Sequence, residues 1–193
     1  MEFDNPSRLD IIKDRLLHHG LVSSLYGRYA DSLGLRGDEQ VLDFGSGSGA
    51  LSRHLARRLL AGGGQVTCLD SSSAWSDVAR RRLQRFPNVH FAVGEITELA
   101  LDPDGFDVIV IHLVLHEIKP ETRPETVKAL YRNLKKTGTL FVREPTKEGH
   151  GIPAAQVRQL MHTAGLTEID FSEARSLLLP PMYAGVFRKA SSA

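Results

Sequence analysis

The chain has 193 residues, of which 41% are hydrophobic and 24% are charged, and its formal net charge at pH 7 is +1. This length favours a single domain, which can bury roughly 70% of its unfolded surface without disulfides or structural metals. The balanced charge excludes a global preference for nucleic acid or acidic membranes, and no apolar run approaches the ~20 residues that span a bilayer.

The single cysteine, Cys68, excludes an intramolecular disulfide and fits a reducing compartment. Because it lies within an apolar run, we expect a buried and unreactive thiol. The polar and acidic start of the chain contains no recognisable secretory signal. We therefore expect a cytoplasmic protein.

The first 33 residues are expected to form two helices. Residues 7–20 carry an apolar stripe at helical spacing, and Gly20 ends that segment. The second helix is expected over residues 22–33 and contains Tyr26 and Tyr29.

From Gln40 the sequence alternates between short apolar runs, typical of strands, and longer segments, typical of helices. The expected strands cover residues 41–44, 65–69, 89–93, 106–111 and 140–143. The expected helices cover residues 50–60, 74–86, 122–134 and 153–164. Nearly continuous apolar strands fit a parallel sheet covered on both faces. The alternation implies right-handed crossovers and a doubly wound sheet.

The end of the chain departs from this pattern. Residues 167–171 and 183–188 are expected to be strands, with no helix between them. Two such strands must either pair antiparallel or lie apart, because a parallel pair needs a long crossover connection.

The stretch Val41-Leu-Asp-Phe-Gly-Ser-Gly-Ser-Gly-Ala-Leu-Ser52 organises the rest of the chain. It runs from a strand through Gly45, Gly47 and Gly49 into a helix. Glycine accepts a positive φ and lets a ligand lie against bare backbone. The helix N-terminus favours an anionic or polar ligand group. Such a turn suits a dinucleotide as well as other nucleosides.

Three acidic residues and two further blocks accompany the glycine-rich turn. Asp43 precedes the first glycine, while Asp70 and Glu95 follow the second and third expected strands. The blocks are residues 106–118 and 130–142. In this order and spacing, over roughly residues 38–190, the sequence resembles the class I S-adenosylmethionine-dependent methyltransferases.

The resemblance implies a mostly parallel, seven-stranded, Rossmann-like α/β sheet. Helices would lie on both faces, and the sheet would end in a reversed C-terminal strand pair. It further implies one methyltransferase domain over residues 1–193, with a helical lid over residues 1–36 and the core over residues 37–193.

The resemblance also implies S-adenosylmethionine as the cofactor. Asp43 would help to order the glycine loop and the amino end of the cofactor, and Asp70 would accept the ribose hydroxyls. Glu95 would lie near the adenine amino group, and Ile96 would cover the adenine face. The alternatives are a helix-cap role for Asp70 and an exposed loop position for Glu95. The complete set of expected cofactor-binding residues is Asp43, Gly45, Ser46, Gly47, Gly49, Asp70, Ser71, Glu95, Ile96 and His112.

Two histidines are candidate catalytic residues. The family places residues that face the methyl donor at the end of the fourth strand, where His112 lies, and His116 follows closely. Histidine can accept a proton from an attacking hydroxyl or amine near neutral pH. Positioning can also suffice for an in-line methyl transfer, in which case these residues shape the pocket wall. His112, His116 and Glu117 could be interpreted as metal ligands, but no other ligand cluster supports a metal, and none is predicted.

Three further residues are candidate substrate contacts. Glu144 ends the fifth strand, beside the expected substrate entrance, where its alternative role is to cap a loop. Tyr26 and Tyr29 lie in the segment that often covers the site in this family. Their alternative is core packing against the sheet.

The expected partner is a small-molecule methyl acceptor, with no membrane and a monomeric or homodimeric protein. An RNA or protein methyltransferase is the alternative within the class. Because Gly45, Gly47 and Ala50 also satisfy a G-x-G-x-x-A pattern, an NAD(P)-dependent oxidoreductase stays open, as does a non-catalytic cofactor-binding subunit. Nucleic acid is not the expected partner. The arginines that could form a nucleic-acid patch are better interpreted as solvated helix faces, and these are Arg53, Arg57, Arg58, Arg80, Arg81, Arg82 and Arg85.

Overall fold

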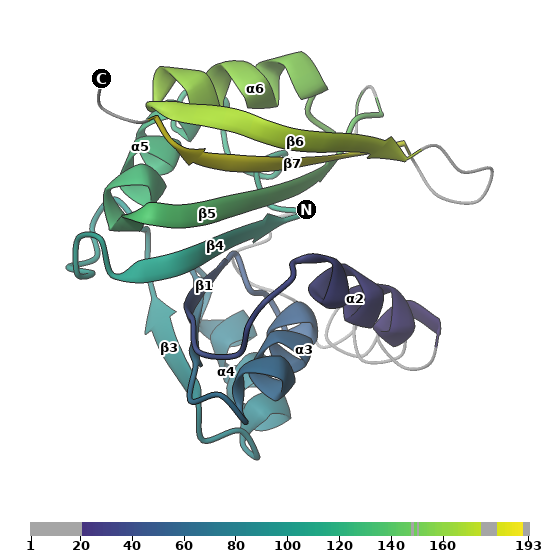
Figure 1. The fold of residues 1–193 in the computed structure, drawn as a ribbon, viewed down its shortest axis with the longest axis vertical. Helices are drawn as coiled ribbons and strands as arrows, with labels where there is room; N and C mark the ends of the chain where they lie inside the picture. Colours follow the sequence, from purple (N-terminus) through teal and green to yellow (C-terminus); the bar gives the residue numbers. More distant parts are fainter. Residues whose placement is uncertain (1–20, 148, 150, 175–180, 191–193) are drawn as a thin grey trace. The chain divides into compact units, whose positions relative to one another are not determined.

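The computed structural model describes residues 21–147, 149, 151–174 and 181–190. The chain divides into two compact units, Met1–Glu95 and Ile96–Ala193. Within the described residues, seven strands alternate with helices (Figure 1), which confirms the predicted α/β class. The first predicted helix, over residues 7–20, lies outside the described residues.

The first unit contains a helix, α2, followed by alternating strands and helices. Its elements are α2 Leu21–Ser32, β1 Gln40–Phe44, α3 Ala50–Leu59, β2 Gln65–Asp70, α4 Ser73–Leu83 and β3 Val89–Val93. Strand β2 pairs in parallel with both β1 and β3. Asp43 is opposite Cys68, and Asp70 is opposite Val93, so the carboxyl ends of these strands meet at one edge.

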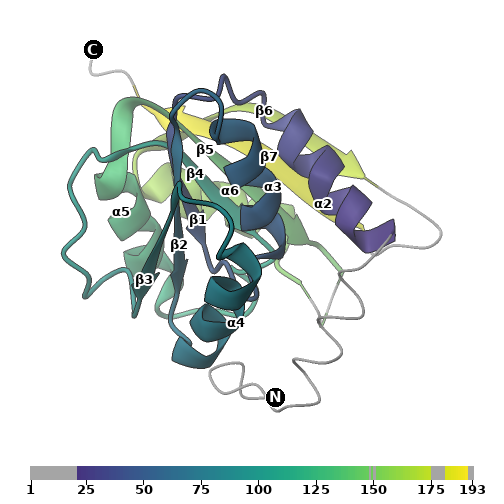
Figure 2. The ribbon, with the colours of Figure 1, turned by 90° about the horizontal axis from the view of Figure 1, so that it is seen from below.

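Apolar packing explains the position of α3. This helix packs against α2, β2 and α4 (Figure 2). Its residues Leu55 and Leu59 are completely buried. On its other side, Arg58 donates hydrogen bonds to the Gly27 carbonyl at 2.8 Å and to Asp31 at 2.9 Å. The guanidinium therefore fixes α2 to α3, and apolar side chains fix α3 to the strands.

The second unit contains the remaining strands in the order β4-β5-β7-β6. Its elements are β4 Phe106–His112, α5 Arg123–Asn133, β5 Leu134–Pro145, α6 Ala154–Thr163, β6 Leu166–Ala174 and β7 Met182–Lys189. Strands β4 and β5 are parallel, whereas β7 is antiparallel to both β5 and β6. This arrangement confirms the predicted reversed pair at the end of the chain.

Two predicted boundaries differ from the structure for local reasons. Helix α4 ends at Leu83 rather than at residue 86, because the Phe86 N–H turns back to the Leu83 carbonyl ahead of Pro87. Strand β5 begins at Leu134, before the predicted residue 140, and its pairing with β4 is irregular near its start. Gly138 lies in that irregular part, where an added Cβ would come within 2.7 Å of Leu134 Cδ1.

The contact between the glycine loop and α4 generates a stability prediction. Gly49 has φ 74°, and a Cβ there would lie 2.9 Å from Leu83 Cδ1. We expect Gly49→Ala to reduce the free energy of unfolding by about 2–4 kcal/mol, because backbone strain and overpacking add. Urea unfolding measures this change.

Gly63→Ala is the matched control. Gly63 also has a positive φ, 81°, but an added Cβ would meet no atom within 4 Å in the part of the chain that the structure describes. We expect this control to lose only about 1–2 kcal/mol from backbone strain. Equal losses for the two variants would show that the α4 contact is not the cause.

Candidate functional site

The glycine loop after β1 is built from three residues with positive φ. Gly45, Gly47 and Gly49 have φ values of 69°, 51° and 74°. The N–H groups of Gly45 and Ser46 both donate to the Leu69 carbonyl, at 2.8 and 3.0 Å. The loop therefore bends back over the end of β2 before α3 begins.

The middle and last glycines face different surroundings. A Cβ on Gly49 would enter the side chains of α4, so this position is closed by packing. Among the described residues, a Cβ on Gly47 would meet nothing within 4 Å. The backbone at Gly47 is therefore open to a ligand.

Asp70 connects the glycine loop to the start of α4. One carboxylate oxygen, Oδ2, accepts the Gly47 N–H at 2.8 Å, and the other, Oδ1, accepts the Ser72 N–H at 2.9 Å. Ser72 in turn caps α4, because its hydroxyl accepts the Trp75 N–H at 3.3 Å.

Asp43 lies beneath the loop with 2% of its surface exposed. The Ser52 hydroxyl donates to its Oδ2 at 2.5 Å, which ties the strand to α3. The pKa of Asp43 is raised to about 7, mainly by burial; the Ser52 hydrogen bond lowers it, and the nearby Asp70 charge raises it. The neighbouring Cys68 thiol is buried, and this burial raises its pKa to about 12. The predicted burial of this thiol is confirmed.

The remaining predicted cofactor residues of the first unit lie at the ends of β2 and β3. Ser71 is exposed, directly after Asp70. Glu95 is exposed after β3, and the Gly94 N–H donates to the Asp70 carbonyl at 3.0 Å, which holds the two strand ends together. Ile96, at the start of the second unit, is 2% exposed. Their contacts with a cofactor stay predictions.

The two predicted tyrosines of α2 differ in exposure. Tyr29 is buried, whereas Tyr26 is half-buried. Tyr26 lines a small polar hollow between α2, α3 and α4. Its other lining residues are Ser23, Ala50, Arg53, His54 and Arg82.

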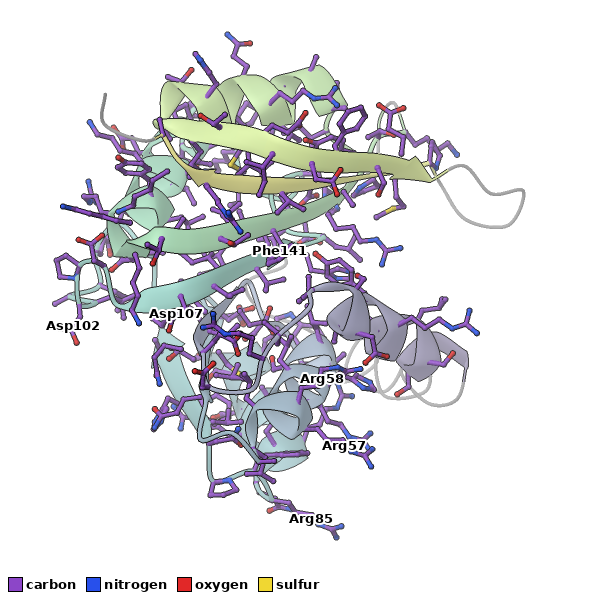
Figure 3. The ribbon with its side chains drawn as sticks, in the orientation of Figure 1. Arg57, Arg58, Arg85, Asp102, Asp107 and Phe141 are labelled. Atoms are coloured by element: carbon purple, nitrogen blue, oxygen red, sulfur yellow. The ribbon has the colours of Figure 1, made fainter. Side chains whose placement is uncertain are left out.

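Several arginines of the predicted solvated faces have partners within the first unit. Arg82 donates to the Ser48 carbonyl at 3.0 Å, and Arg80 lies over the Phe91 ring at 4.5 Å. Figure 3 shows Arg57 and Arg85 extending away from the ribbon, whereas Arg58 makes the α2 contacts described above. The arginines of α3 and α4 therefore include structural residues as well as solvated ones.

The second unit holds a separate polar cluster after β4. Glu144, near the end of β5, is completely buried. Its Oε1 accepts the N–H groups of Val114 and Leu115, both at 2.8 Å, and its Oε2 lies 2.6 Å from His116 Nδ1. The hydrogen bond with Glu144 raises the pKa of His116, and the charges of Glu144 and Glu117 act in the same direction.

The backbone around His116 is held from both sides. Leu113 has φ 63°, an uncommon value for a residue other than glycine, and its N–H donates to the Arg143 carbonyl at 2.9 Å. Arg123 is 7% exposed and donates to the Ile118 carbonyl at 2.8 Å and to the His116 carbonyl at 3.3 Å. The loop after β4 is therefore a constrained structure.

The structure joins some of the predicted residues and adds others. Asp70 is hydrogen-bonded to Gly47, and Glu144 is hydrogen-bonded to His116. His112 is half-buried at the end of β4. Sequence reasoning missed the roles of Ser52, Ser72 and Arg123. The run of serines before α4 is a recognisable helix-cap signal, whereas nothing local in the sequence indicates that Ser52 or Arg123 is buried.

Within the described ranges, no group of three or more histidine, cysteine, aspartate or glutamate residues could hold a metal ion. In the same part of the chain, no helix is long and apolar enough to cross a membrane.

Solved structures define the class of the fold. A methyltransferase from Methanosarcina mazei, described as S-adenosylmethionine-dependent, matches with a TM-score of 0.70 and 19% identity over 80% of this chain and 94% of that one. A 1,6-didemethyltoxoflavin-N1-methyltransferase from Burkholderia thailandensis matches with a TM-score of 0.70 and 19% identity, over 97% and 93% of the two chains. The chain has the seven-stranded α/β fold of these methyltransferases.

The family model described as a methyltransferase domain matches residues 41–138, just over half of the 193-residue chain. The protein therefore belongs to the methyltransferase domain family. A ubiquinone/menaquinone biosynthesis C-methyltransferase from Vibrio campbellii is 31% identical over 73% of this chain and 54% of its own length. A carboxy-S-adenosyl-L-methionine synthase from Erwinia tasmaniensis is 23% identical over 88% and 70%. The chain thus spans about half the length of the C-methyltransferase.

The buried Asp43 carboxyl generates a prediction about stability and pH. The folded pKa of about 7 lies above the ordinary 3.8, so the folded state holds this proton more tightly than the unfolded state. Stability should therefore fall as the pH rises from about 4 to about 7. Asp43→Asn removes the titrating group. From pH 5 to pH 8 the free energy of unfolding of the wild type should therefore fall by about 2 kcal/mol more than that of the variant.

Urea unfolding of both proteins at the two pH values measures this difference. Because the comparison is between pH values, any constant effect of the asparagine amide cancels. A stability difference between the two proteins that is the same at pH 5 and pH 8 would contradict the raised pKa.

Proposed function

We propose that this protein transfers the methyl group of S-adenosylmethionine to a small-molecule acceptor. The single observation that carries the proposal is the hydrogen bond from the Gly47 N–H to Asp70. It sets an acidic side chain at the end of β2 beside an open, positive-φ glycine backbone.

The residues of the first unit fit an adenosyl ligand. Asp70 offers carboxylate oxygens, which can accept vicinal ribose hydroxyls. The open backbone at Gly47 leaves room for a ligand to approach the loop, and the N-terminus of α3 favours polar groups there. When bound, S-adenosylmethionine supplies an electrophilic methyl group on a sulfonium.

The other predicted residues act on the same ligand in this proposal. Ser46 and Ser71 flank the loop and the ribose acid, and Asp43 orders the loop from below through Ser52. Glu95 binds the adenine amino group, with Ile96 against the ring. His112, at the end of β4, is the remaining proposed cofactor contact.

A small-molecule acceptor is supported by the named relatives. The Vibrio campbellii relative is a C-methyltransferase of ubiquinone and menaquinone biosynthesis, and the Burkholderia thailandensis structure contains 1,6-didemethyltoxoflavin and S-adenosylhomocysteine. The arginines of α3 and α4 that bind Ser48, Phe91 and Gly27 are already part of the fold. They are therefore a poor basis for a nucleic-acid surface.

Asp70→Ala tests the cofactor assignment. We expect it to weaken S-adenosylhomocysteine binding by about 100-fold or more, because hydrogen bonds to a charged group contribute about 1.5–3 kcal/mol each. Isothermal titration calorimetry measures the affinity. Asp77→Ala, at an exposed acid on α4, is the matched control and should bind as the wild type does. Unchanged affinity in the Asp70 variant would refute the ribose assignment.

The acceptor class is tested with tritiated S-adenosylmethionine. The full-length protein is incubated with a host extract that is then separated into metabolites, RNA and protein. We expect the label in the metabolite fraction, because the proposed acceptor is a small molecule. Label in RNA or protein would overturn that part of the proposal and leave the cofactor assignment intact.

A further inference from the structure

We propose that His116 is the proton acceptor of this protein, held in the reactive tautomer by Glu144, and that the methyl acceptor is a molecule with a weakly acidic hydroxyl, such as a phenol or an enol. This inference rests on the proposed methyl transfer. It adds to that function a named base, a positioning residue and a substrate class.

The hydrogen bonds of Glu144 determine which nitrogen of His116 carries the proton. Its Oε1 accepts two backbone N–H groups, and its Oε2 lies 2.6 Å from His116 Nδ1. A carboxylate can only accept hydrogen bonds. Nδ1 must therefore carry a proton, and in the neutral ring the lone pair is on Nε2.

The two partners differ in exposure. The Glu144 side chain is completely buried, whereas 20% of the His116 side chain is exposed. His116 Nε2 lies 3.9 Å from Glu117 Oε1, which is longer than a hydrogen bond but within ion-pair distance once the ring is protonated. The pair thus has a fixed, buried acid behind an imidazole that reaches the surface.

The loop that carries His116 is strained. Leu113 holds a positive φ of 63° between the end of β4 and the residues that bind Glu144. Such conformations are unfavourable for residues other than glycine and are concentrated at functional sites. In an open α/β sheet, ligands bind beyond the carboxyl ends of the strands, which is where this loop lies.

The chemistry requires a base for hydroxyl acceptors in particular. The hydroxyl proton passes to His116 Nε2 while the electron pair of the acceptor, on oxygen or on the conjugated carbon, forms a bond to the methyl carbon. The bond between methyl and sulfur breaks, and its electron pair stays on sulfur, which becomes a neutral thioether. The imidazolium is stabilised by Glu144 and later releases its proton to water. A neutral amine already has a nucleophilic lone pair and needs no such base, whereas an amine that is protonated at neutral pH must first lose its proton.

The charged groups around His116 give the direction of the pH dependence. Glu144 from β5 and Glu117 from the same loop raise its pKa, whereas Arg123 from α5 lowers it. The net shift is upward from the ordinary 6.5. Because the base must be neutral, we expect methyl transfer to rise with pH and to reach its half-maximum above pH 6.5.

Glu144→Gln tests the tautomer of His116 most directly. The glutamine oxygen can still accept the N–H groups of Val114 and Leu115, but its amide group donates to His116 Nδ1. That donation forces the proton onto Nε2 and removes the acceptor atom. We expect the ¹⁵N chemical shifts of the His116 ring to show the tautomer change, and methyl transfer to fall by about 100-fold or more.

The experiment uses the full-length protein, tritiated S-adenosylmethionine and the metabolite extract, with cation exchange separating basic from non-basic products. His116→Asn is the second variant, and His162→Asn, at an exposed position on α6, is the matched control. We expect label in non-basic products, loss of transfer in both site variants, and S-adenosylhomocysteine affinity close to wild type throughout.

Each opposite result overturns the inference. These are label in basic products, transfer within about twofold of wild type in either site variant, or wild-type His116 with its proton on Nε2. Failure of the proposed function looks different. In that case the wild type binds no S-adenosylhomocysteine and transfers no label, while the nuclear magnetic resonance spectrum still reports the Glu144–His116 pair.

Discussion

The hydrogen bonds of the Asp70 carboxylate are the constraint on which the first unit depends. One side chain holds the glycine loop through Gly47 and the start of α4 through Ser72. Three glycines give this loop its positive φ values, and the Asp70 hydrogen bond fixes one of them, Gly47. The same carboxylate therefore shapes the binding surface and offers its charge to the ligand.

In the second unit, too, one carboxylate holds a loop through backbone N–H groups, but this carboxylate also binds a histidine. Glu144 is a buried acid that holds two backbone N–H groups of a strand-end loop and orients one histidine. In both units a carboxylate at the end of one strand holds the loop that follows the neighbouring strand. Parallel strands make this possible, because their carboxyl ends emerge together and leave polar groups that no strand partner satisfies.

Much of the fold could be predicted from the sequence, because periodicity and glycine positions are local signals. The parallel strands and the reversed pair of β6 and β7 follow from the presence or absence of helices between apolar runs. The start of β5 could not be predicted. Its first residues have no apolar pattern, and they pair irregularly with β4, a property of the folded register that no local signal encodes.

Some residues of the candidate site could likewise be predicted from the sequence, and others could not. Asp43, Asp70 and the glycines could be predicted because their spacing is local. The pairing of Glu144 with His116 joins residues 28 positions apart, so only the folded register brings them together. Likewise, the burial of Asp43 beside Ser52, which raises its pKa, is a property of packing that no motif encodes.

The central claim is that the loop around Gly47 and Asp70 binds an S-adenosyl group rather than a nicotinamide dinucleotide. The most direct measurement is thermal unfolding of the wild-type protein with S-adenosylhomocysteine and, separately, with NADH. At 100 times its dissociation constant, a ligand stabilises the folded state by about 2.7 kcal/mol, which is roughly 5–10 °C for a domain of this size. We predict this shift with S-adenosylhomocysteine and none with NADH. A shift with NADH alone would contradict the account.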